Sequence, residues 1–189
     1  MIIYLHGFAS AGFGQKAQKF LEYFEEELIT PTLSTIPNLA IATIEQLIEA
    51  FQQRGEKVSL VGSSLGGFYA LYLANKYDIK AVLINPAVSP WLTLEEYRKD
   101  ADDFARSFYD GSRFEFNKSH ISSLRNYEVL NVASPDKIMT LLQTDDEVLD
   151  YNDAAEKLSD TNITIEEGGN HSFMGIESYF RKVDSFLNN

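Results

Sequence analysis

The 189-residue sequence contains no cysteine, which excludes disulfide bonds and sites in which thiolates hold a metal. Lysine and arginine are also scarce: 16 of them face 28 aspartates and glutamates, so the formal net charge is −12. A charge of this sign repels nucleic acid and anionic membranes at long range, and we expect neither as a partner. No apolar run approaches the roughly 20 residues of a membrane span, and no export signal is visible. The sequence therefore predicts a cytoplasmic protein.

The chain is nevertheless long and apolar enough to bury a core, since 44% of its residues are hydrophobic and 23% are charged. Segments with the patterns of strands and helices alternate along it. Strands are expected at residues 2–5, 27–32, 57–61, 80–85, 138–142 and 163–166, and helices at 15–27, 39–53, 65–76, 151–158 and 174–187. This alternation predicts an α/β fold whose mainly parallel sheet carries helices on both faces.

Residues 91–130 interrupt the alternation and are rich in aromatic side chains. Eight of these 40 residues are aromatic, whereas the chain as a whole is 13% aromatic. We expect a single domain spanning residues 1–189, in which residues 91–130 form a lid or cap over the functional site. Most of the rings would pack the core of the cap itself, while Trp91 and Phe108 would line a substrate pocket.

Residues 62–66, Gly-Ser-Ser-Leu-Gly, stand between an expected strand and an expected helix and fit the G-x-S-x-G pattern of a nucleophile elbow. In such a turn a strained backbone lifts the nucleophile clear of the sheet, and a Cβ atom at either glycine would collide with the crossing strand and helix. Only Ser64 has glycines two positions before and two positions after it. Ser64 is therefore the candidate nucleophile, and the backbone N–H of Leu65 is a candidate oxyanion donor.

A serine nucleophile needs a base, and the chain has three histidines. In this fold the base comes last in chain order, and His171 follows the last expected strand through a glycine-rich loop, so we expect His171 to be the base. His6 follows the first strand and is expected to hold that loop in place. The second oxyanion donor would then be the N–H of Phe8, with Ala9 as the neighbouring candidate. His120 is interpreted as an ordinary surface or cap residue.

The acid of the triad is expected after the strand at residues 138–142, where four carboxylates crowd between positions 145 and 150. Asp150 is placed to cap the helix that follows, and Glu147 is expected to point outward. The pattern alone leaves Asp145 and Asp146 as competing candidates.

Together these motifs resemble those of the YqiA-like esterases, a family of small bacterial α/β-hydrolases. The resemblance is carried by residues 3–8, 62–67, 85–88, 142–151 and 168–173. It implies a minimal α/β-hydrolase fold with six parallel strands. It also implies cleavage of acyl esters or thioesters by Ser64, Asp146 and His171, without a metal or an organic cofactor. One position departs from the family pattern, which resembles Thr-Gly-Asp-Glu-Val, because Asp145 stands in the place of its glycine.

Two further arguments favour Asp146 over Asp145 as the acid. Val148 is apolar and is expected to turn back into the core, which would make Asp146 face the site. Two adjacent carboxylates cannot both be buried against one imidazole, because like charges at that range oppose double ionisation. The sequence therefore predicts a serine hydrolase of small-molecule esters or thioesters. The alternative is a non-catalytic ligand-binding protein on the same fold.

Overall fold

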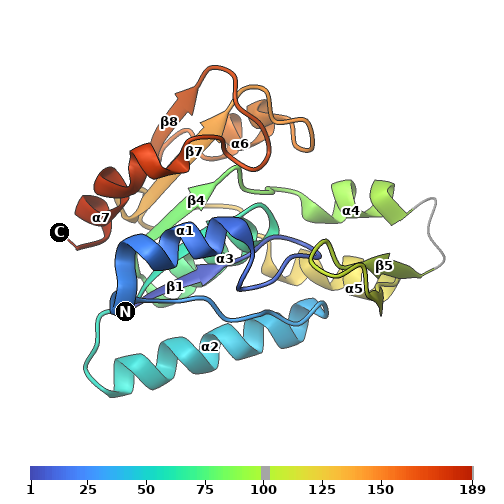
Figure 1. The fold of residues 1–189 in the computed structure, drawn as a ribbon, viewed down its shortest axis with the longest axis horizontal. Coiled ribbons are helices and arrows are strands. Elements are labelled where there is room, and N and C mark those ends of the chain that lie inside the picture. Colours follow the sequence, from blue (N-terminus) through green and yellow to red (C-terminus); the bar gives the residue numbers. More distant parts are fainter. Residues whose placement is uncertain (99–102, 189) are drawn as a thin grey trace.

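A computed structural model describes residues 1–98 and 103–188. Its central sheet has six parallel strands in the order β2-β1-β3-β4-β7-β8 (Figure 1). In chain order the strands are β1 (Ile2–Leu5), β2 (Leu28–Ile29), β3 (Ser59–Ser63), β4 (Ala81–Ile84), β7 (Ile138–Gln143) and β8 (Asn162–Glu166). The chain moves from β1 outward to β2 and then returns to β3 on the other side of β1. In open α/β sheets, ligands bind beyond the carboxyl ends of the strands at such a reversal.

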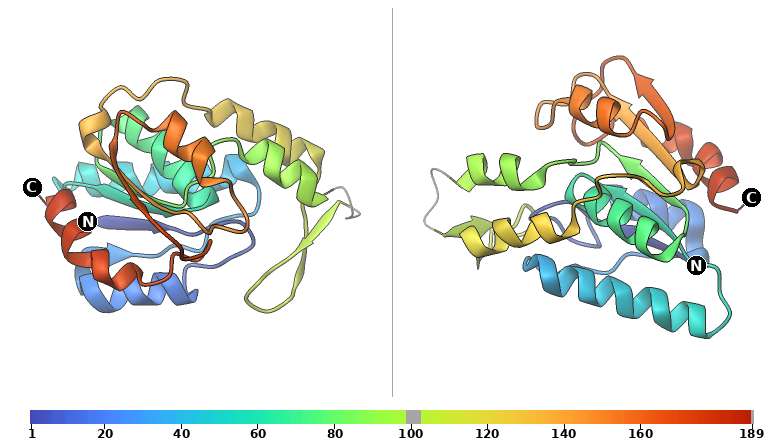
Figure 2. Two further views of the ribbon diagram at one scale, coloured as in Figure 1. Left: turned by 90° about the horizontal axis from the view of Figure 1, so that it is seen from above. Right: turned by 180° about the vertical axis from the view of Figure 1, so that it is seen from behind.

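Helices cover both faces of this sheet, as predicted (Figure 2). One face carries α1 (Gln15–Phe24) and α7 (Phe180–Asn188), and the other carries α2 (Pro37–Gln53), α3 (Leu65–Tyr77) and α6 (Tyr151–Lys157). Successive strand side chains point to opposite faces. In β1, Ile3 and Leu5 therefore join the core beneath α2 and α3, whereas Ile2 and Tyr4 join the core beneath α1 and α7. Burial on both faces explains why the strands are continuously apolar.

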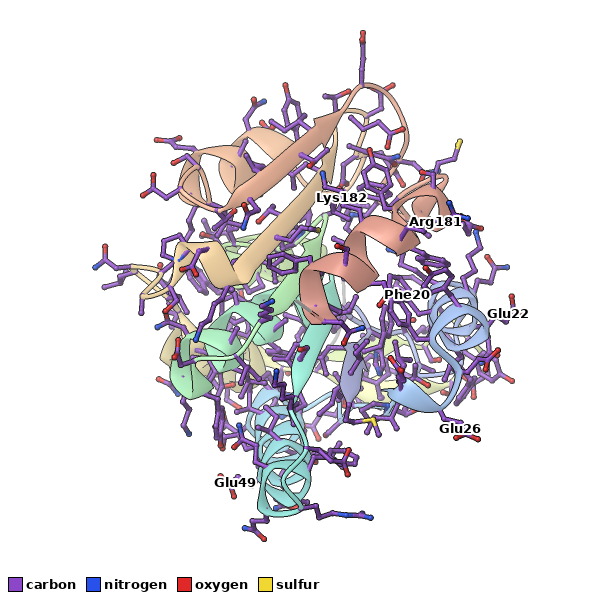
Figure 3. All side chains as sticks on the ribbon, turned by 90° about the vertical axis from the view of Figure 1, so that its left-hand side faces the viewer. Phe20, Glu22, Glu26, Glu49, Arg181 and Lys182 are labelled. Carbon is purple, nitrogen blue, oxygen red and sulfur yellow. The ribbon has the colours of Figure 1, made fainter. Side chains whose placement is uncertain are left out.

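Phe20 shows how the smaller of the two cores is closed. Its side chain is fully buried, and its ring centroid lies 4.7 Å from that of Phe180 in α7 and 5.2 Å from that of Tyr4 in β1. Figure 3 shows Phe20 between the two helices, whereas Glu22 and Glu26 point away from the sheet. The apolar face that predicted a helix in this segment is thus the face that packs.

We call residues 91–130 the cap segment, and its described residues lie together at one end of the molecule, on the right in Figure 1. The region contains α4 (Pro90–Arg98), a hairpin of β5 (Phe104–Arg106) and β6 (Arg113–Glu115), α5 (Lys118–Ser123) and a 3-10 turn, η2 (Leu124–Tyr127). The hairpin turn contacts the loop after β1, because the N–H of Phe108 donates to the carbonyl oxygen of Ala9 at 2.8 Å. The segment therefore extends over the region that follows the first strand.

The predicted helices and strands of the main sheet are present, with differences at their ends. The strand expected at residues 27–32 is only two residues long, since Pro31 has no N–H with which to extend the pairing. The remaining 3-10 turns are η1 (Glu25–Glu27), η3 (Pro135–Lys137) and η4 (Ile176–Tyr179), so the last predicted helix starts as a 3-10 turn. Among the described residues, no helix has the length and apolar character needed to cross a membrane.

Candidate active site

Ser64 occupies the sharp turn between β3 and α3, with φ 56° and ψ −122°. A positive φ is strained for any residue with a side chain, and such strain is typical of nucleophile elbows. A Cβ atom on Gly62 would collide with the carbonyl of Gly66, and one on Gly66 would collide with the carbonyl of Leu5. The predicted reason for these two glycines, close crossing of strand and helix, is thus confirmed.

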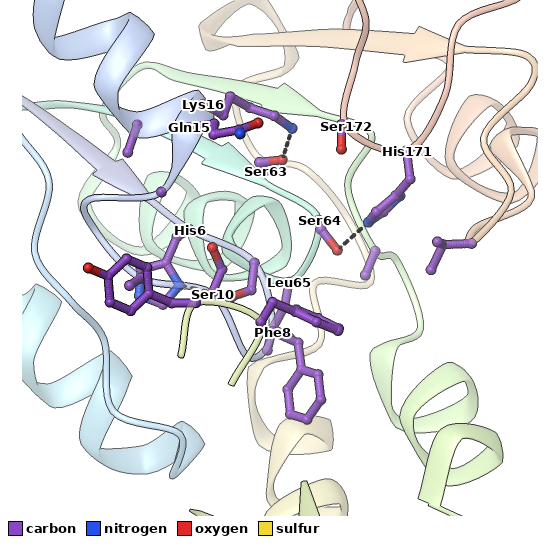
Figure 4. Close-up of a pocket in the computed structure, with 18 of the residues that line it drawn as sticks. His6, Phe8, Ser10, Gln15, Lys16, Ser63, Ser64, Leu65, His171 and Ser172 are labelled. Carbon is purple, nitrogen blue, oxygen red and sulfur yellow. Dashed lines mark hydrogen bonds between the residues drawn. The ribbon is translucent and has the colours of Figure 1, made fainter. Parts of the chain in front are cut away.

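The structure brings Ser64, His171 and Asp146 into one hydrogen-bonded series, and Figure 4 shows the Ser64–His171 bond of that series. The hydroxyl oxygen of Ser64 lies 3.1 Å from His171 Nε2, and His171 Nδ1 lies 2.9 and 2.8 Å from the two carboxylate oxygens of Asp146. Since Asp146 accepts a hydrogen bond, the proton belongs on Nδ1. Nε2 is then free to accept the hydrogen bond of the Ser64 hydroxyl.

Asp146 is the carboxylate beside the histidine, and Asp145 is not. The Asp146 side chain is only 2% exposed, and its Oδ1 also accepts the N–H groups of Val148 and Leu149, each at 2.9 Å. Burial favours a higher pKa for Asp146, but the hydrogen bonds from His171 and from these two amides outweigh it and lower the pKa below its usual value. The Asp145 side chain is exposed on the same loop.

One expectation about this loop is corrected by the structure, and two are confirmed. Val148 does not turn into the core: it is 51% exposed and lines the cavity described below, because the loop is held by the two amides that bind Asp146. Glu147 is exposed as expected, but its Oε2 accepts the N–H of His171 at 2.9 Å and so joins the two loops. Asp150 caps α6 as predicted, by accepting the N–H two residues further on at 2.9 Å.

His6 is buried in the loop after β1 and uses both ring nitrogens within the protein. Nε2 accepts the N–H of Leu33 at 2.9 Å, so Nδ1 carries the proton and donates to the carbonyl of Gly7 at 2.8 Å. Burial lowers the pKa of His6 below its usual value, which favours this neutral form. His6 therefore holds the loop, as the sequence predicted.

The loop after β1 lies directly against Ser64. A Cβ atom placed on Gly7 would be 3.2 Å from the Cβ of Ser64. Phe8 and Leu65, the predicted oxyanion donors, both line the cavity in front of Ser64. Leu65 is the first residue of α3, and N–H groups in the first turn of a helix have no acceptor within the helix. The Phe8 ring is fixed by Phe116 of the cap segment, with 4.6 Å between centroids.

A cavity of about 740 Å³ opens in front of Ser64 and His171. Its walls come from the loop after β1, from α1, from the start of α4 and from the hairpin turn of the cap segment. Phe108 lines it, as predicted, with a side chain that is 73% exposed. Two further aromatic residues at its mouth, Phe13 and Tyr109, contact each other edge to face at 4.5 Å. Neither ring was predicted to belong to the site.

Trp91 does not line this cavity, and the prediction that it does is wrong. The side chain of Trp91 is buried and packs against Phe68 of α3, with 6.1 Å between ring centroids. The guanidinium of Arg125 lies 4.9 Å from the centroid of the same ring. The cavity instead takes Pro90, Thr93 and other residues from this region. The orientation of α4 therefore assigns Trp91 to the packing between the cap segment and α3.

Two buried polar side chains, whose roles the sequence analysis missed, hold the histidine loop. Asn85 donates to the carbonyls of Asn170 at 3.0 Å and His171 at 3.3 Å. Gln143 accepts the N–H groups of Asn170 at 3.0 Å and Met174 at 2.9 Å, and it donates to the carbonyl of Met174 at 2.8 Å. The available signal was a polar residue that directly follows an apolar strand, at the end where the site lies.

Lys16 is a third functional candidate that the sequence analysis missed. It lies on α1 and lines the cavity, and its ammonium nitrogen is 2.6 Å from the hydroxyl oxygen of Ser63 (Figure 4). Ser63 directly precedes Ser64 in the chain, and Lys16 and Ser64 line the same cavity. A cation therefore belongs to the cavity that Ser64 faces.

Comparisons with known proteins agree with this fold and these motifs. Residues 1–188 match the family model described as "Uncharacterised protein family (UPF0227)". A UPF0227 protein of Serratia proteamaculans (strain 568) is 28% identical over 198 residues, which cover 98% of each chain.

The structure is also similar to solved α/β-hydrolases. Against mouse alpha/beta hydrolase domain-containing protein 10 the TM-score is 0.68, with 18% identity over 99% of this chain and 89% of that one. Against a monoacylglycerol lipase of Paleococcus ferrophilus it is 0.67, with 16% identity over 98% and 93% of the two chains. The six-stranded parallel sheet is thus an α/β-hydrolase fold, as predicted. The chain belongs to the UPF0227 family, the YqiA-like group that its motifs resemble.

Proposed function

We propose that this protein is a serine hydrolase that cleaves small acyl esters or thioesters through a covalent acyl-enzyme on Ser64. One observation carries the proposal: the hydrogen-bonded series from Ser64 through His171 to the buried carboxylate of Asp146. A serine hydroxyl is a weak nucleophile, and a base oriented by a third group is the arrangement that activates it.

The first half of the reaction forms the acyl-enzyme. His171 Nε2 takes the proton of Ser64 while the serine oxygen attacks the acyl carbonyl. Asp146 keeps the imidazole in the required tautomer and stabilises its positive charge. The N–H groups of Phe8 and Leu65 bind the oxyanion, and the N-terminus of α3 adds a partial positive charge beside it. The imidazolium then gives its proton to the leaving alcohol or thiol.

The second half releases the acid. His171 deprotonates a water molecule, the water attacks the acyl-enzyme through a second oxyanion, and the proton returns to Ser64. Apart from the water molecule, all of these steps use groups of the protein itself. The cavity supports this proposal because it places apolar walls around Ser64, and cap residues such as Phe108 supply part of them. The likeness to a monoacylglycerol lipase also supports ester cleavage.

The test is labelling with a fluorophosphonate probe, which forms a covalent adduct with an activated serine. The unaltered protein is expected to gain one adduct, mapped to Ser64 by peptide mass. Ser63→Ala is the matched control: it should still be labelled, because its Ser64 and His171 are unchanged. Ser64→Ala should not be labelled, and it should lower kcat on a short p-nitrophenyl ester by about 10⁴ or more. A non-catalytic ligand-binding protein would show no adduct and no hydrolysis.

A further inference from the structure

Lys16 gives the cavity a positive charge, although the protein as a whole is strongly acidic. The whole chain has 28 acidic and 16 basic residues. Among the described residues that line the cavity, however, Lys16 is the one lysine or arginine, and none is an aspartate or glutamate. The wall beside the nucleophile is therefore positive in a strongly acidic protein.

Lys16 has more hydrogen-bond donors than acceptors among the described residues of the protein. An ammonium group carries three N–H donors. One of them binds Ser63 Oγ at 2.6 Å, and in the described part of the chain no carboxylate forms an ion pair with Lys16. Lys19, one turn further along the same helix, shows the ordinary arrangement, since its ammonium pairs with Glu177 at the surface. Lys16 thus keeps donors for a group that enters the cavity.

The buried position of the Lys16 ammonium is energetically unfavourable in the protein without a bound ligand. Removing an ammonium from water without a paired anion is unfavourable, and an anion brought to the site offsets that cost. Burial lowers the pKa of Lys16 to about 8, against the opposing effect of the Asp146 charge, while Lys19 lowers it further. The group is therefore mostly charged at pH 7 and can bind an anion there.

We infer that Lys16 binds an anionic group of the substrate, a carboxylate or a phosphate, so that the protein selects anionic esters over neutral ones. This inference rests on the proposed function and narrows its substrate class. Because Lys16 and Ser64 line the same cavity, one small ester can place its anionic group at Lys16 and its acyl carbonyl at Ser64. The net charge of −12 repels anions at long range, so the selection comes from contact with Lys16 and not from long-range steering.

The experiment compares matched ester pairs by the acid released at constant pH. Monomethyl glutarate and methyl valerate have acyl chains of equal length and differ in the terminal carboxylate. Carboxymethyl butyrate and ethyl butyrate place the same difference in the alcohol half. A third pair, 2-phosphoethyl butyrate and butyl butyrate, tests phosphate in place of carboxylate. Each pair is measured with the unaltered protein and with Lys16→Met and Lys16→Arg. Lys19→Met serves as the control on the same helix.

The unaltered protein is expected to show a kcat/KM for at least one anionic ester about tenfold or more above that for its neutral partner. Lys16→Met should remove this preference, mainly through KM, while Lys16→Arg and Lys19→Met should keep most of it. The inference is overturned if the unaltered protein prefers the neutral member of every pair. It is equally overturned if Lys16→Met lowers both members of a pair by the same factor, since Lys16 would then act on Ser63 or on the fold.

Two measurements on the unaltered protein keep the test decisive if a variant does not fold. Glutarate should slow fluorophosphonate labelling at about a tenth of the concentration that valerate requires. The preference for the anionic ester should also decline as the pH rises through about 8, where Lys16 loses its proton. Labelling without either effect refutes the inference and leaves the proposed function intact. Absence of labelling and of all hydrolysis refutes the proposed function itself.

Discussion

Replacing Gln143 by methionine should show how much the histidine loop depends on one buried amide. The side chain is 1% exposed and makes hydrogen bonds to backbone groups of Asn170 and Met174 and to the Glu166 carboxylate. Methionine has a side chain of similar length that is flexible enough to fill the same space, but it has neither the carbonyl acceptor nor the amide donor of glutamine. The substitution therefore removes the hydrogen bonds while leaving most of the packing in place.

The expected loss of stability follows from the groups left behind. Three backbone groups lose their partner: the N–H of Asn170 and both the N–H and the carbonyl of Met174. An unpaired buried polar group costs about 1–3 kcal/mol. Met174 is itself 64% exposed, so its groups can turn toward water and the lower end of that range applies. The free energy of unfolding should fall by about 3 kcal/mol, which typical stabilities of 5–15 kcal/mol tolerate.

Activity should fall further than stability alone would imply. Gly169 packs so closely on Gln143 that a Cβ atom there would collide with the amide, and its φ is 81°. When the amide is lost, this loop can relax and carry His171 away from Ser64. A misplacement of about 1 Å in a reacting group can cost on the order of 10² in rate, so we expect kcat to fall about 100-fold.

The assays are equilibrium urea unfolding and hydrolysis of a short p-nitrophenyl ester by the folded variant. Gln52→Met, at an exposed position of α2, is the control for introducing methionine and should change neither quantity. A loss of stability below about 0.5 kcal/mol for Gln143→Met would show that the orphaned groups find other partners. Full activity in a clearly destabilised variant would show that the base does not depend on this amide. Either result contradicts the reasoning.

Three further predictions concern the acid, the cavity wall and the loop histidine. Asp146→Asn should lower kcat by about 10²–10⁴ by favouring the wrong imidazole tautomer, whereas Asp145→Asn should cost less than about tenfold; the reverse ranking on the same ester would transfer the role of acid to Asp145. Phe108→Ala should change the preference for acyl chain length with little loss of stability, whereas Trp91→Ala should lower the unfolding free energy by about 3–5 kcal/mol. Urea unfolding measures the stability and a series of esters of rising chain length measures the preference; equal effects of the two variants on the preference would contradict the cavity assignment. Because the pKa of His6 is lowered in the folded protein, the unfolded state binds the proton more tightly, so the contribution of His6 to stability is complete above about pH 6.5 and declines as the pH falls through that value. Urea titrations from pH 8 to 5 should show this decline in the free energy of unfolding, and His6→Gln should abolish it.

The sequence was most informative where function depends on local geometry. The elbow around Ser64 could be predicted because its glycines are required within five consecutive residues and the strained turn follows directly from them. His171 could be found from chain order. The choice of Asp146 needed the family resemblance, and one of its supporting arguments was wrong. Val148 is exposed because amide hydrogen bonds hold the loop, and apolar character does not reveal such bonds.

The residues that sequence reasoning missed act through partners distant in the chain. Lys16 meets Ser63 across 47 positions, and Gln143 meets Met174 across 31. Lys16 has no local pattern that distinguishes it from another helix lysine. Gln143 is marked as a polar residue at the end of an apolar strand, but that position does not identify its partners. Trp91 was misassigned for a related reason: composition shows that the cap segment is aromatic, whereas the rotation of α4 decides which rings meet the cavity.

The hydrogen bond from the N–H of Phe108 to the carbonyl of Ala9 links the cap segment to the loop after β1. Ala9 has a φ of 55° and directly follows Phe8, so this strained turn is anchored by the N–H of Phe108, a residue distant in the chain. The cap segment therefore cannot be exchanged for that of a relative without regard to this hydrogen bond. A hairpin transplanted from a relative to alter specificity would have to bring a backbone N–H to the same place. A graft without that donor would change the turn next to Phe8 along with the shape of the cavity.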